Sequence, residues 1–554
     1  MLKIAQCNES AVRAIEAELG LPSLIARILV ARGFHSPDAV HPFLSPKLES
    51  LSDPYLLPDM EKGVAKTVEA IETGRKIALF GDYDADGITS VALMKNFLKH
   101  LDIVPDVSLP RRQDGYGLNE RTVQMFSEQD ADLLICLDCG SSNKAEIESA
   151  HQLGIQVIVL DHHEVPDTPA QPYALINPKR QGSRFPTREL AACGVTFFFL
   201  VALRRALAAR HLLPNSINLK REMDLVAVGT VADMVPLTGD NRLLVRFGLE
   251  TMRKRPRTWF KSFLKKHVVR RGRTDEFTLG FGVAPRINAA GRVADPQIAL
   301  SFLTADLEIE TEEYLLRLNE ANRKRQDLEE SILREALEQL EMETVYRENS
   351  IVLFHQDWPI GVLGIVAHRL VDRTGKPAIV LTRTEKAWRG SARGLEGMDL
   401  HGTISSLAPL FLAFGGHRHA CGITLREENL LPLRDAFETE VRTSMEGFVR
   451  EVAIDAVAGY EDLTKEVVEM IDLFAPFGIG NPRPNLLLPP SAVSLSNGFA
   501  RITDSNKRTW RGSVQKGASP PGAPVARVVA APTMREEMGE KFIHLLIKDF
   551  IPAE

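Results

Sequence analysis

The chain contains little cysteine and no extended run of uncharged apolar residues. Its five cysteines are scattered over 554 residues: Cys7, Cys136, Cys139, Cys193 and Cys421. A number so small, and odd, excludes a disulfide framework and indicates a reducing compartment. The first residues lack the apolar core of a signal peptide, and no apolar run reaches the length that spans a bilayer. The sequence therefore predicts a cytoplasmic protein that does not contact a membrane.

A strong charge of one sign is also missing. The 67 Lys and Arg residues nearly balance the 73 Asp and Glu residues, for a formal net charge of -6. This balance argues against a protein that binds nucleic acid through bulk positive charge, although local basic stretches matter more than the total. The clearest basic stretch covers residues 253–273 and contains Trp259 and Phe260. It predicts either a nucleic-acid contact or a solvated helix face.

The order of patterns along the chain predicts an α/β protein of three or four domains, because 554 residues are too many for one core. Residues 1–53 read as a helical region. In residues 54–305 strands alternate with helical patterns, which is typical of a mainly parallel sheet. Residues 306–345 form a long connecting helix, and residues 346–451 a second α/β lobe. Short β-like segments in residues 452–554 predict a small β-barrel.

Three short acidic clusters in the first half of the chain each follow an apolar run. They are 81–87 (Gly-Asp-Tyr-Asp-Ala-Asp-Gly), Asp138-Cys139-Gly140 and Asp161-His162-His163. The runs before them are typical of buried parallel strands, and sites in open α/β sheets lie beyond the carboxyl ends of the strands. Carboxylates gathered there repel one another unless a cation lies among them. The clusters therefore predict a divalent-metal site.

The residue types narrow the choice of metal. Imidazole beside carboxylates favours manganese, magnesium or zinc over calcium, and no Glu closes a calcium-binding loop that opens at Asp82 or Asp84. A fourth acid, Asp233, follows the apolar run 225–232. Four acidic segments and a histidine can hold two ions about 3.5–4 Å apart, the spacing used for in-line displacement at phosphorus. Asp82, Asp84 and Asp86 share a face on an extended backbone, unless a turn at the strand end redirects them.

In this order, the four segments Asp82 to Gly87, Asp138 to Gly140, Asp161 to His163 and Val231 to Met234 resemble the motifs of the DHH phosphoesterase superfamily. Within it the chain is similar to the bacterial single-strand-specific 5′→3′ exonucleases. Further matches lie at residues 285–292, 361–367, 415–417 and 476–482. The resemblance implies a DHH domain, a long connecting helix, a DHH-associated domain and a C-terminal OB-fold.

The resemblance also assigns roles at the metal site. The residues that it implies as metal ligands are Asp82, Asp84, Asp86, Asp138, His162 and Asp233. Asp138 bridges both ions, Asp84 serves one ion, and Asp86, His162 and Asp233 serve the other, with Asp82 nearby. His163 contacts the scissile phosphate or, alternatively, orients His162. Arg286 neutralises charge on the phosphoryl oxygens, which suits its planar fork, or forms a structural salt bridge.

Substrate contacts are implied in other motifs. Ser391 and Arg393, in the Gly-rich stretch 390–394, grip the terminal 5′-phosphate, and Gly416 and His417 line the same region. Asn288 belongs to the motif of Arg286. Either Arg111 or Arg112 contacts the substrate, depending on whether the motif is counted back from Gly115 or forward from Pro110. The chain departs from the family pattern at Pro359-Ile360 and Arg418-His419.

The activity implied is a metal-dependent exonuclease that degrades single-stranded DNA from its 5′ end to 5′-mononucleotides, in DNA repair and recombination. Two Mn²⁺ or Mg²⁺ ions would be its cofactors. Basic and aromatic residues of the barrel would add a path for the strand: Arg501, Lys507, Arg508, Trp510 and Arg511. Expected partners are single-stranded DNA, single-strand-binding protein and a RecQ-type helicase, and the protein is expected to be a monomer.

Two other functions compete with this prediction. A DHH phosphodiesterase for short oligonucleotides or cyclic dinucleotides needs the two lobes without the C-terminal barrel. A catalytically silent scaffold in a replication complex would have lost metal ligands, whereas each acid that the resemblance requires, and His162, is present.

Overall fold

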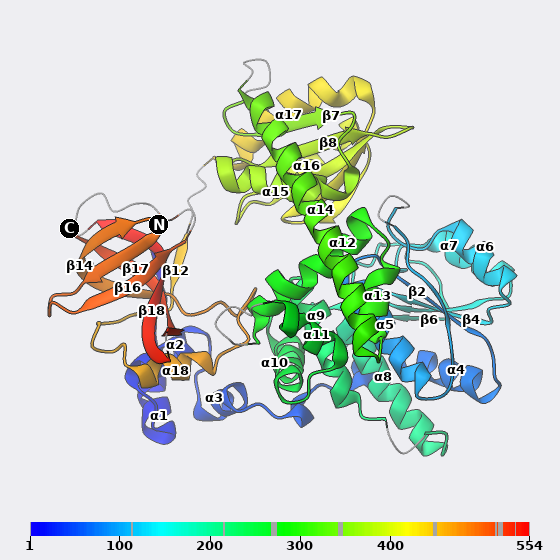
Figure 1. Cartoon of the computed structure of the whole chain (residues 1–554), viewed down its shortest axis with the longest axis horizontal. Helices are drawn as coiled ribbons and strands as arrows, with labels where there is room; N and C mark the ends of the chain where they lie inside the picture. The colour runs from blue at the N-terminus through cyan, green and yellow to red at the C-terminus, as the bar shows by residue number, and fades with distance from the viewer. Residues whose placement is uncertain are drawn as a thin grey trace. The chain divides into compact units, whose positions relative to one another are not determined.

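The computed structural model describes residues 2–111, 115–213, 217–267, 274–341, 347–446, 451–515, 518, 525–537 and 539–552 (Figure 1). The chain divides into two compact units. Unit 1 comprises Met1–Ser108, Gly117–Ala284 and Glu451–Glu554, and unit 2 comprises Leu109–Tyr116 and Pro285–Arg450. The fold class predicted from the sequence is confirmed, and the five-part domain division stays a prediction.

A five-stranded parallel sheet forms the centre of unit 1, in the order β3-β2-β4-β5-β6. The strands are β2 (Ile77–Gly81), β3 (Asp106–Ser108), β4 (Leu133–Leu137), β5 (Gln156–Leu160) and β6 (Ala174–Ile176). Gly81 pairs with Leu137, and Leu137 with Leu160, so β2, β4 and β5 end level with one another. The residue after each of these strands is an aspartate, and the register therefore gathers the three acidic clusters at one edge.

Helices cover both faces of this sheet. The helices of this part of unit 1 are α4 (Met60–Glu72), α5 (Ala85–Lys99), α6 (Glu120–Glu128), α7 (Lys144–Gln152), α8 (Ala192–Ala209), α9 (Met223–Ala232), α10 (Gly239–Lys254) and α11 (Thr258–Lys266), of which α10 packs against α9. Phe126 of α6 and Ile147 of α7 pack with Phe80, Leu134 and Val159 on one face. Helices α4, α5 and α8 contact strands on the other side, and α5 packs against α8 and α9. Short helical turns complete the unit: η1 (Leu48–Ser50), η2 (Pro54–Leu56), η4 (Leu219–Glu222) and the π-helix η6 (Thr278–Val283).

Helix α8 is long and apolar enough to cross a membrane, with 18 residues and a mean hydropathy of 1.6. By length and composition, the expectation that no apolar run reaches this length is therefore wrong. However, 67% of the helix is buried inside the protein, and its aromatic residues Phe197, Phe198 and Phe199 lie in the core. An apolar helix buried within a sheet protein is an ordinary core helix.

The C-terminal strands close into a small barrel. They are β13 (Ala456–Val457), β14 (Leu486–Ser496), β15 (Phe499–Thr503), β16 (Thr509–Val514), β17 (Val525–Glu537) and β18 (Glu540–Pro552). The sheet order is β13-β14-β15-β16-β18-β17, and the additional β14–β17 pairing closes the ring. Five strands closed in this way are consistent with the predicted OB-fold. Helix α18 (Lys465–Asp472) packs against β17.

The N-terminal helices share one hydrophobic core with this barrel. They are α1 (Glu9–Leu19), α2 (Ser23–Ala31) and α3 (Pro37–Leu44). Buried residues such as Ile15 and Ile28 belong to the same cluster as Leu486, Val528 and Leu545 of the barrel. Strand β1 (Leu2–Ile4) also pairs in parallel with β12 (Val452–Ile454). The two ends of the sequence thus fold together, an arrangement that the sequence patterns did not reveal.

Unit 2 consists of a helical segment and a mixed five-stranded sheet of order β10-β11-β9-β8-β7. Its strands are β7 (Ile351–His355), β8 (Ala378–Arg383), β9 (Trp388–Arg393), β10 (Phe411–His417) and β11 (Ala420–Leu425). Its helices are α12 (Ala284–Val293), α13 (Gln297–Thr304), α14 (Glu308–Leu340), α15 (Leu363–Thr374), α16 (Leu400–Ser406) and α17 (Leu430–Ser444), with η7 (Ile360–Val362), η8 (Ala408–Leu410) and η9 (Glu427–Asn429).

The 33-residue helix α14, green in Figure 1, is the predicted long helix. Its buried Glu329 accepts hydrogen bonds from Arg325, at 2.6 Å, and from Arg369 of α15. This carboxylate therefore links α14 to α15.

We expect Ile28→Ala to lower the free energy of unfolding by about 2–5 kcal/mol, because Ile28 is fully buried in the core that α2 shares with the barrel. Hydrogen exchange should show loss of protection in β14 and β17 as well as in α2. The exposed Val104→Ala serves as a control and should change stability by less than about 0.5 kcal/mol. Loss of protection confined to α2 would contradict the shared core.

Candidate active site

The turn between β2 and α5 separates the three aspartates of the first cluster. Asp82 follows the strand, Asp84 is the N-cap of α5, and Asp86 lies in the first helical turn. The carboxylate of Asp84 accepts hydrogen bonds from the backbone N–H groups of Asp86 (2.9 Å) and Gly87 (3.2 Å). The N-cap turn thus redirects the side chains away from the common face that an extended backbone would give them.

Asp138 directly follows β4 and has a left-handed backbone, with φ of 65°. Its N–H donates to the carbonyl of Leu160 at 2.9 Å, which continues the ladder between β4 and β5 by one residue. A non-glycine residue in this region carries a local energetic cost of about 1–3 kcal/mol and persists where its surroundings hold it. Burial and the charges of Asp86, Asp84 and Asp82 raise the pKa of Asp138 well above its usual value.

Asp161 organises the two histidines that follow it. It accepts hydrogen bonds from the backbone N–H groups of Ser141 (3.0 Å), His162 (2.7 Å) and His163 (3.1 Å), and from Nδ1 of His163 (2.9 Å). Burial alone would raise its pKa, but the bond and charge of His163 outweigh burial and hold the pKa of Asp161 well below its usual value. Burial conversely lowers the pKa of His163, and Asp161 outweighs this and raises it. The two side chains form an ion pair.

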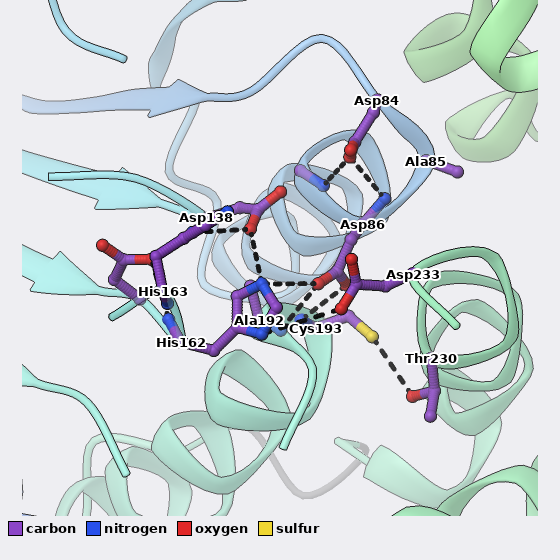
Figure 2. Close-up of polar contacts among 12 residues, drawn as sticks. Asp84, Ala85, Asp86, Asp138, His162, His163, Ala192, Cys193, Thr230 and Asp233 are labelled. Atoms are coloured by element: carbon purple, nitrogen blue, oxygen red, sulfur yellow. Dashed lines mark hydrogen bonds and ion pairs between the residues drawn. The ribbon is translucent and has the colours of Figure 1, made fainter. Parts of the chain in front are cut away.

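Asp86 is buried and is held by a segment more than a hundred residues away. Its carboxylate accepts hydrogen bonds from the N–H groups of Ala192 (2.7 Å) and Cys193 (2.9 Å), at the start of α8 (Figure 2). Burial raises its pKa to about 6, although the bonds from Cys193 and Ala192 act in the opposite direction. The sequence gives no signal for the N-terminus of α8 as part of the site. Asp161 belongs to a predicted acidic cluster, but the sequence assigns it no role of its own.

Asp233 comes from a helix end, as the C-cap of α9, and not from a strand end. Burial and the charges of Asp86 and Asp84 raise its pKa well above the usual value. The ring of His162 lies between the acids: Nδ1 is 3.6 Å from Asp233, and Nε2 is 3.3 Å from Asp138 and 3.9 Å from Asp86. Figure 2 shows these side chains converging on the buried ring of His162.

The side chains form groups whose ligand atoms lie within 4.8 Å of one another. One group is Asp86, His162 and Asp233; a second is Asp82, Asp84 and Asp138; a third joins Asp138 to both histidines. The first two groups share no residue, so the site has donors for two ions. Oxygen-rich donors with one imidazole suit Mn²⁺ or Mg²⁺. Burial and neighbouring carboxylates raise the pKa values of Asp86, Asp138 and Asp233, the direction expected for acids gathered without a cation among them. The residues therefore fit the predicted pair of ions.

Arg286 and Asn288 lie on α12 in unit 2, both half-buried. Nε of Arg286 donates to Oδ1 of Asn319, on α14, at 2.7 Å. Burial lowers the pKa of Arg286. The long helix therefore orients this guanidinium through the neutral amide of Asn319.

Ser391 and Arg393 lie two residues apart on β9, so they share a face of the sheet. Nη1 of Arg393 donates to Oγ of Ser391 at 2.6 Å and to the carbonyl of Ala392 at 2.7 Å. The first turn of α15 faces the pair, because a methyl group added at Gly364 would lie 2.7 Å from Nη2 of Arg393 and 3.2 Å from Oγ of Ser391. A helix N-terminus beside a hydroxyl and a guanidinium favours an anion.

Gly416 and His417 end β10, which pairs with β11, and β11 in turn pairs with β9. Gly416 has φ of 146°, and a Cβ there would lie 2.2 Å from the carbonyl oxygen of Ala420, so the hairpin accepts only glycine. His417 is exposed. Arg111, in unit 2, lies 3.6 Å from Asp295 and is also exposed, whereas Arg112 lies outside the described residues.

Several of the basic and aromatic candidates have structural partners. Arg257 donates to Asp224 and Glu222, and the buried Trp259 donates to Asp224 at 3.1 Å. Arg257, Trp259 and Phe260 are thus engaged within the protein, which neither the nucleic-acid contact nor the solvated helix face predicts. The side chains of Lys261, Lys265 and Lys266 are exposed, and residues 268–273 lie outside the described residues.

In the barrel, the Trp510 ring lies 5.4 Å from Tyr460, and its Nε1 donates to Asp504 at 3.1 Å. This tryptophan therefore has a packing role of its own. The described cysteines are all free and none forms a disulfide, as expected; Cys136, Cys139, Cys193 and Cys421 are buried.

Comparison with known families defines the class of the protein. Residues 76–230 match the DHH family N-terminal domain, and residues 347–443 match the DHHA1 domain. The first match contains β2, β4, β5 and their acidic ends, and the second contains Ser391, Arg393 and the β10–β11 hairpin. The protein therefore has the fold of a DHH phosphoesterase, with a DHHA1 domain as its second lobe.

The chain belongs to the RecJ family. It is 32% identical over 570 residues to the single-stranded-DNA-specific exonuclease RecJ of Bacillus subtilis, covering 100% of this chain and 71% of that protein. It is also 32% identical to RecJ of Escherichia coli, over 84% of this chain and 83% of that protein. The crystal structure of RecJ in complex with Mn²⁺ from Thermus thermophilus superposes with a TM-score of 0.83, at 28% identity, covering 100% of this chain and 80% of that one.

We expect Mn²⁺ to raise the melting temperature, and to do so more at about pH 8 than at about pH 6. The pKa values of Asp86, Asp138 and Asp233 are raised in the folded state, so without metal their contribution to stability is present at low pH and is lost as pH rises through those values, about 6 for Asp86. An ion then replaces the protons. Stabilisation of about 2.7 kcal/mol is expected at an Mn²⁺ concentration of about 100 times Kd.

Differential scanning fluorimetry with and without chelator measures this effect. The near-isosteric Asp138→Asn is the control: it removes one repelling charge, so it should keep or raise the metal-free melting temperature and lose most of the Mn²⁺-dependent rise. An equal rise at both pH values, or a full rise in Asp138→Asn, would contradict a metal site at this carboxylate.

Proposed function

We propose that the protein is a metal-dependent exonuclease that degrades single-stranded DNA from its 5′ end to 5′-mononucleotides, in DNA repair and recombination. The observation that carries the proposal is the pair of independent ligand groups around His162 and Asp138, in a chain of the RecJ family. The names of the relatives support single-stranded DNA as the substrate, and the Mn²⁺-bound relative supports the choice of metal.

The ligand assignment follows the grouping. Asp86, His162 and Asp233 would hold one ion, Asp82 and Asp84 the other, and Asp138 would bridge the two. Bound ions supply a nucleophilic water and stabilise charge on the attacking and leaving oxygens of an in-line displacement. The N–H groups at the start of α8 keep Asp86 oriented toward this position, and Asp161 keeps the carboxyl end of β5 in place.

His163 is the candidate for contact with the scissile phosphate. Its side chain is 33% exposed, against 9% for His162, so substrate can reach it. Asp161 holds Nδ1 and raises the pKa of the ring, which favours the cationic form that donates to a phosphate oxygen. Arg286, oriented by Asn319, would bind further phosphoryl oxygens.

The 5′→3′ direction would come from unit 2. Ser391, Arg393 and the first turn of α15 provide a hydroxyl, a guanidinium and backbone N–H groups, the donors that bind a terminal phosphate. Asn288, Gly416, His417 and one of Arg111 and Arg112 would add substrate contacts. A phosphodiesterase for short oligonucleotides or cyclic dinucleotides is the weaker proposal, because the chain includes the barrel and aligns with RecJ relatives along its full length.

Further proposals follow from family membership. The protein would work in the cytoplasm as a monomer, with single-strand-binding protein and a RecQ-type helicase as partners. Residues 1–53, 54–305, 306–345, 346–451 and 452–554 would be its structural divisions.

A polarity assay tests the proposed activity. Single strands and duplexes labelled at the 5′ or the 3′ end are incubated with Mn²⁺ or Mg²⁺, and products are separated by size. A 5′-labelled single strand should release labelled mononucleotide at once, while the duplex and chelated samples stay intact. Asp138→Ala should abolish turnover without unfolding the protein, because the carboxylate serves the ions. Release from the 3′ end, or near-normal turnover of the variant in saturating Mn²⁺, would refute the proposal.

For end recognition, we expect Arg393→Ala to raise KM at least roughly tenfold for a 5′-phosphorylated strand and to leave KM for a 5′-hydroxyl strand nearly unchanged. A charge-assisted hydrogen bond contributes about 1.5–3 kcal/mol. Arg383→Ala, an exposed arginine of the same sheet paired with Glu427, is the matched control and should change neither value. Equal penalties on both strands would place the terminal phosphate away from Arg393.

A further inference from the structure

A loop between α18 and β14 packs onto the chain just beyond Asp233. Residues 476–482, Pro-Phe-Gly-Ile-Gly-Asn-Pro, are called the clamp loop here; both this loop and residues 233–238 belong to unit 1. By its sequence the loop is a family motif without an assigned role. The structure brings it to within three residues of a predicted metal ligand.

The contact between the two segments is close. The N–H of Leu237 donates to the carbonyl of Ile479 at 2.7 Å. Gly480 has φ of 72°, and a Cβ there would lie 3.0 Å from Cβ of Pro236 and 3.1 Å from Cγ2 of Thr238. A Cβ at Gly478 would lie 2.8 Å from the side chain of Leu237. The loop therefore reaches residues 236–238 through positions that have no side chain.

The clamp loop is itself held in one conformation. Gly478 and Asn481 exchange two backbone hydrogen bonds, at 3.0 and 3.1 Å. The side chain of Asn481 is buried; its Nδ2 donates to the carbonyls of Phe474 (2.9 Å) and Pro476 (2.8 Å), and its Oδ1 accepts from Arg32 at 2.8 Å. Arg32 also pairs with Asp455 at 3.1 Å. The loop thus presents a fixed surface to residues 236–238.

The chain between Asp233 and this contact contains a strained residue. The N–H of Asp233 donates to the carbonyl of Gly229 at 2.9 Å, which continues α9. Met234 then adopts a left-handed backbone, with φ of 61°, and its side chain is 67% exposed, so its own packing contributes little. Strain of this kind persists where neighbouring structure determines it. Hydrogen bonds to residues on either side of Met234 supply that constraint: the helix before it, and after it the clamp loop together with Asn241, whose Nδ2 donates to Pro236 at 3.1 Å.

We infer that the clamp loop is a positioning element for Asp233: by fixing residues 236–238 it holds the Asp233 carboxylate in the geometry that binds metal. The inference rests on the proposed role of Asp233 as a ligand. Groups that orient metal ligands typically contribute 10- to 100-fold to metal affinity. The segment that leads into the barrel therefore contributes to the metal centre as well as to the fold.

The test compares two glycine substitutions in the full-length protein. Gly480→Ala places a methyl group against Pro236 and Thr238. Gly498→Ala is the matched control, because Gly498 has a similar φ of 77° in the turn between β14 and β15 but would place its Cβ at no atom within 4 Å. Both substitutions place a side chain on a backbone of similar positive φ, and only the first brings a methyl group against residues 236–238. Mn²⁺ affinity is measured by calorimetry and by the electron paramagnetic resonance signal of free Mn²⁺.

We expect Gly480→Ala to weaken Mn²⁺ binding about tenfold or more relative to Gly498→Ala. Nuclease activity of Gly480→Ala should recover as Mn²⁺ approaches saturation. Gly478→Ala, which has an ordinary backbone and presses only on the flexible side chain of Leu237, provides a second variant if Gly480→Ala does not fold. Equal Mn²⁺ affinities for the folded clamp-loop variant and Gly498→Ala would overturn the inference.

A third arm separates this result from failure of the proposed function. Asp233→Ala should lose Mn²⁺ affinity at least as strongly as the clamp-loop variants. If Asp233→Ala lowers Mn²⁺ affinity and Gly480→Ala does not, the assignment of Asp233 as a ligand stands and the inference about the clamp loop is refuted. If Asp233→Ala binds Mn²⁺ normally, the ligand assignment itself is refuted and the clamp inference falls with it.

Discussion

The mutual repulsion of buried carboxylates is the constraint on which the rest of this structure depends. Asp82, Asp86, Asp138 and Asp161 are all buried beside the ends of β2, β4 and β5. Burial of charge without compensation is costly, so each acid requires a proton, a hydrogen-bond donor or a cation. Asp161 meets this need with His163 and three backbone N–H groups, and the pKa of this acid is lowered. The pKa values of Asp86 and Asp138 are raised, because their donors do not offset burial and like charge. The direction of the pKa shift therefore distinguishes Asp161, which orients His163, from Asp86 and Asp138, which are suited to bind ions.

Strand ends and helix ends together build this site. Strand register brings Asp82, Asp138 and Asp161 level, since Gly81, Leu137 and Leu160 are paired neighbours. Helix ends supply the remainder: Asp84 caps α5, the first N–H groups of α8 bind Asp86, and Asp233 closes α9. A helix N-terminus carries partial positive charge, so α8 reduces the cost of a charged Asp86 even though burial still dominates its pKa. Because α8 is long, apolar and mostly buried, its N-terminus is fixed in position and its N–H groups stay directed at Asp86.

Local patterns sufficed for β2, β4 and β5 and for the aspartates that follow them, although the similar apolar run before Asp233 forms helix α9. They did not suffice where the partner is distant in the sequence. The donors to Asp86 lie at residues 192–193, and nothing local marks them. The shared core of Ile28 and Leu545 joins opposite ends of the chain. Trp259 and Trp510 stood out as aromatic residues among basic ones, yet each donates to an aspartate and packs within its own domain. Composition identifies residues able to bind nucleic acid, whereas tertiary contacts decide which of them are already engaged.

The two sites proposed to bind phosphate differ in the charge that the protein supplies. Around Asp138 the protein supplies negative charge, so a phosphate approaches only when cations outweigh the acids. Around Arg393 it supplies the opposite, a guanidinium, a hydroxyl and a helix N-terminus, which need no ion. Removal of metal should therefore silence the first site and leave the second able to hold an anion. If both assignments hold, a chain end would be bound without metal, and recognition and hydrolysis would depend on different atoms. The carboxylates of the metal centre repel one another, so distant elements such as the N-terminus of α8 hold them in place. The proposed anion site needs only Ser391 and Arg393 of β9 and the first turn of α15.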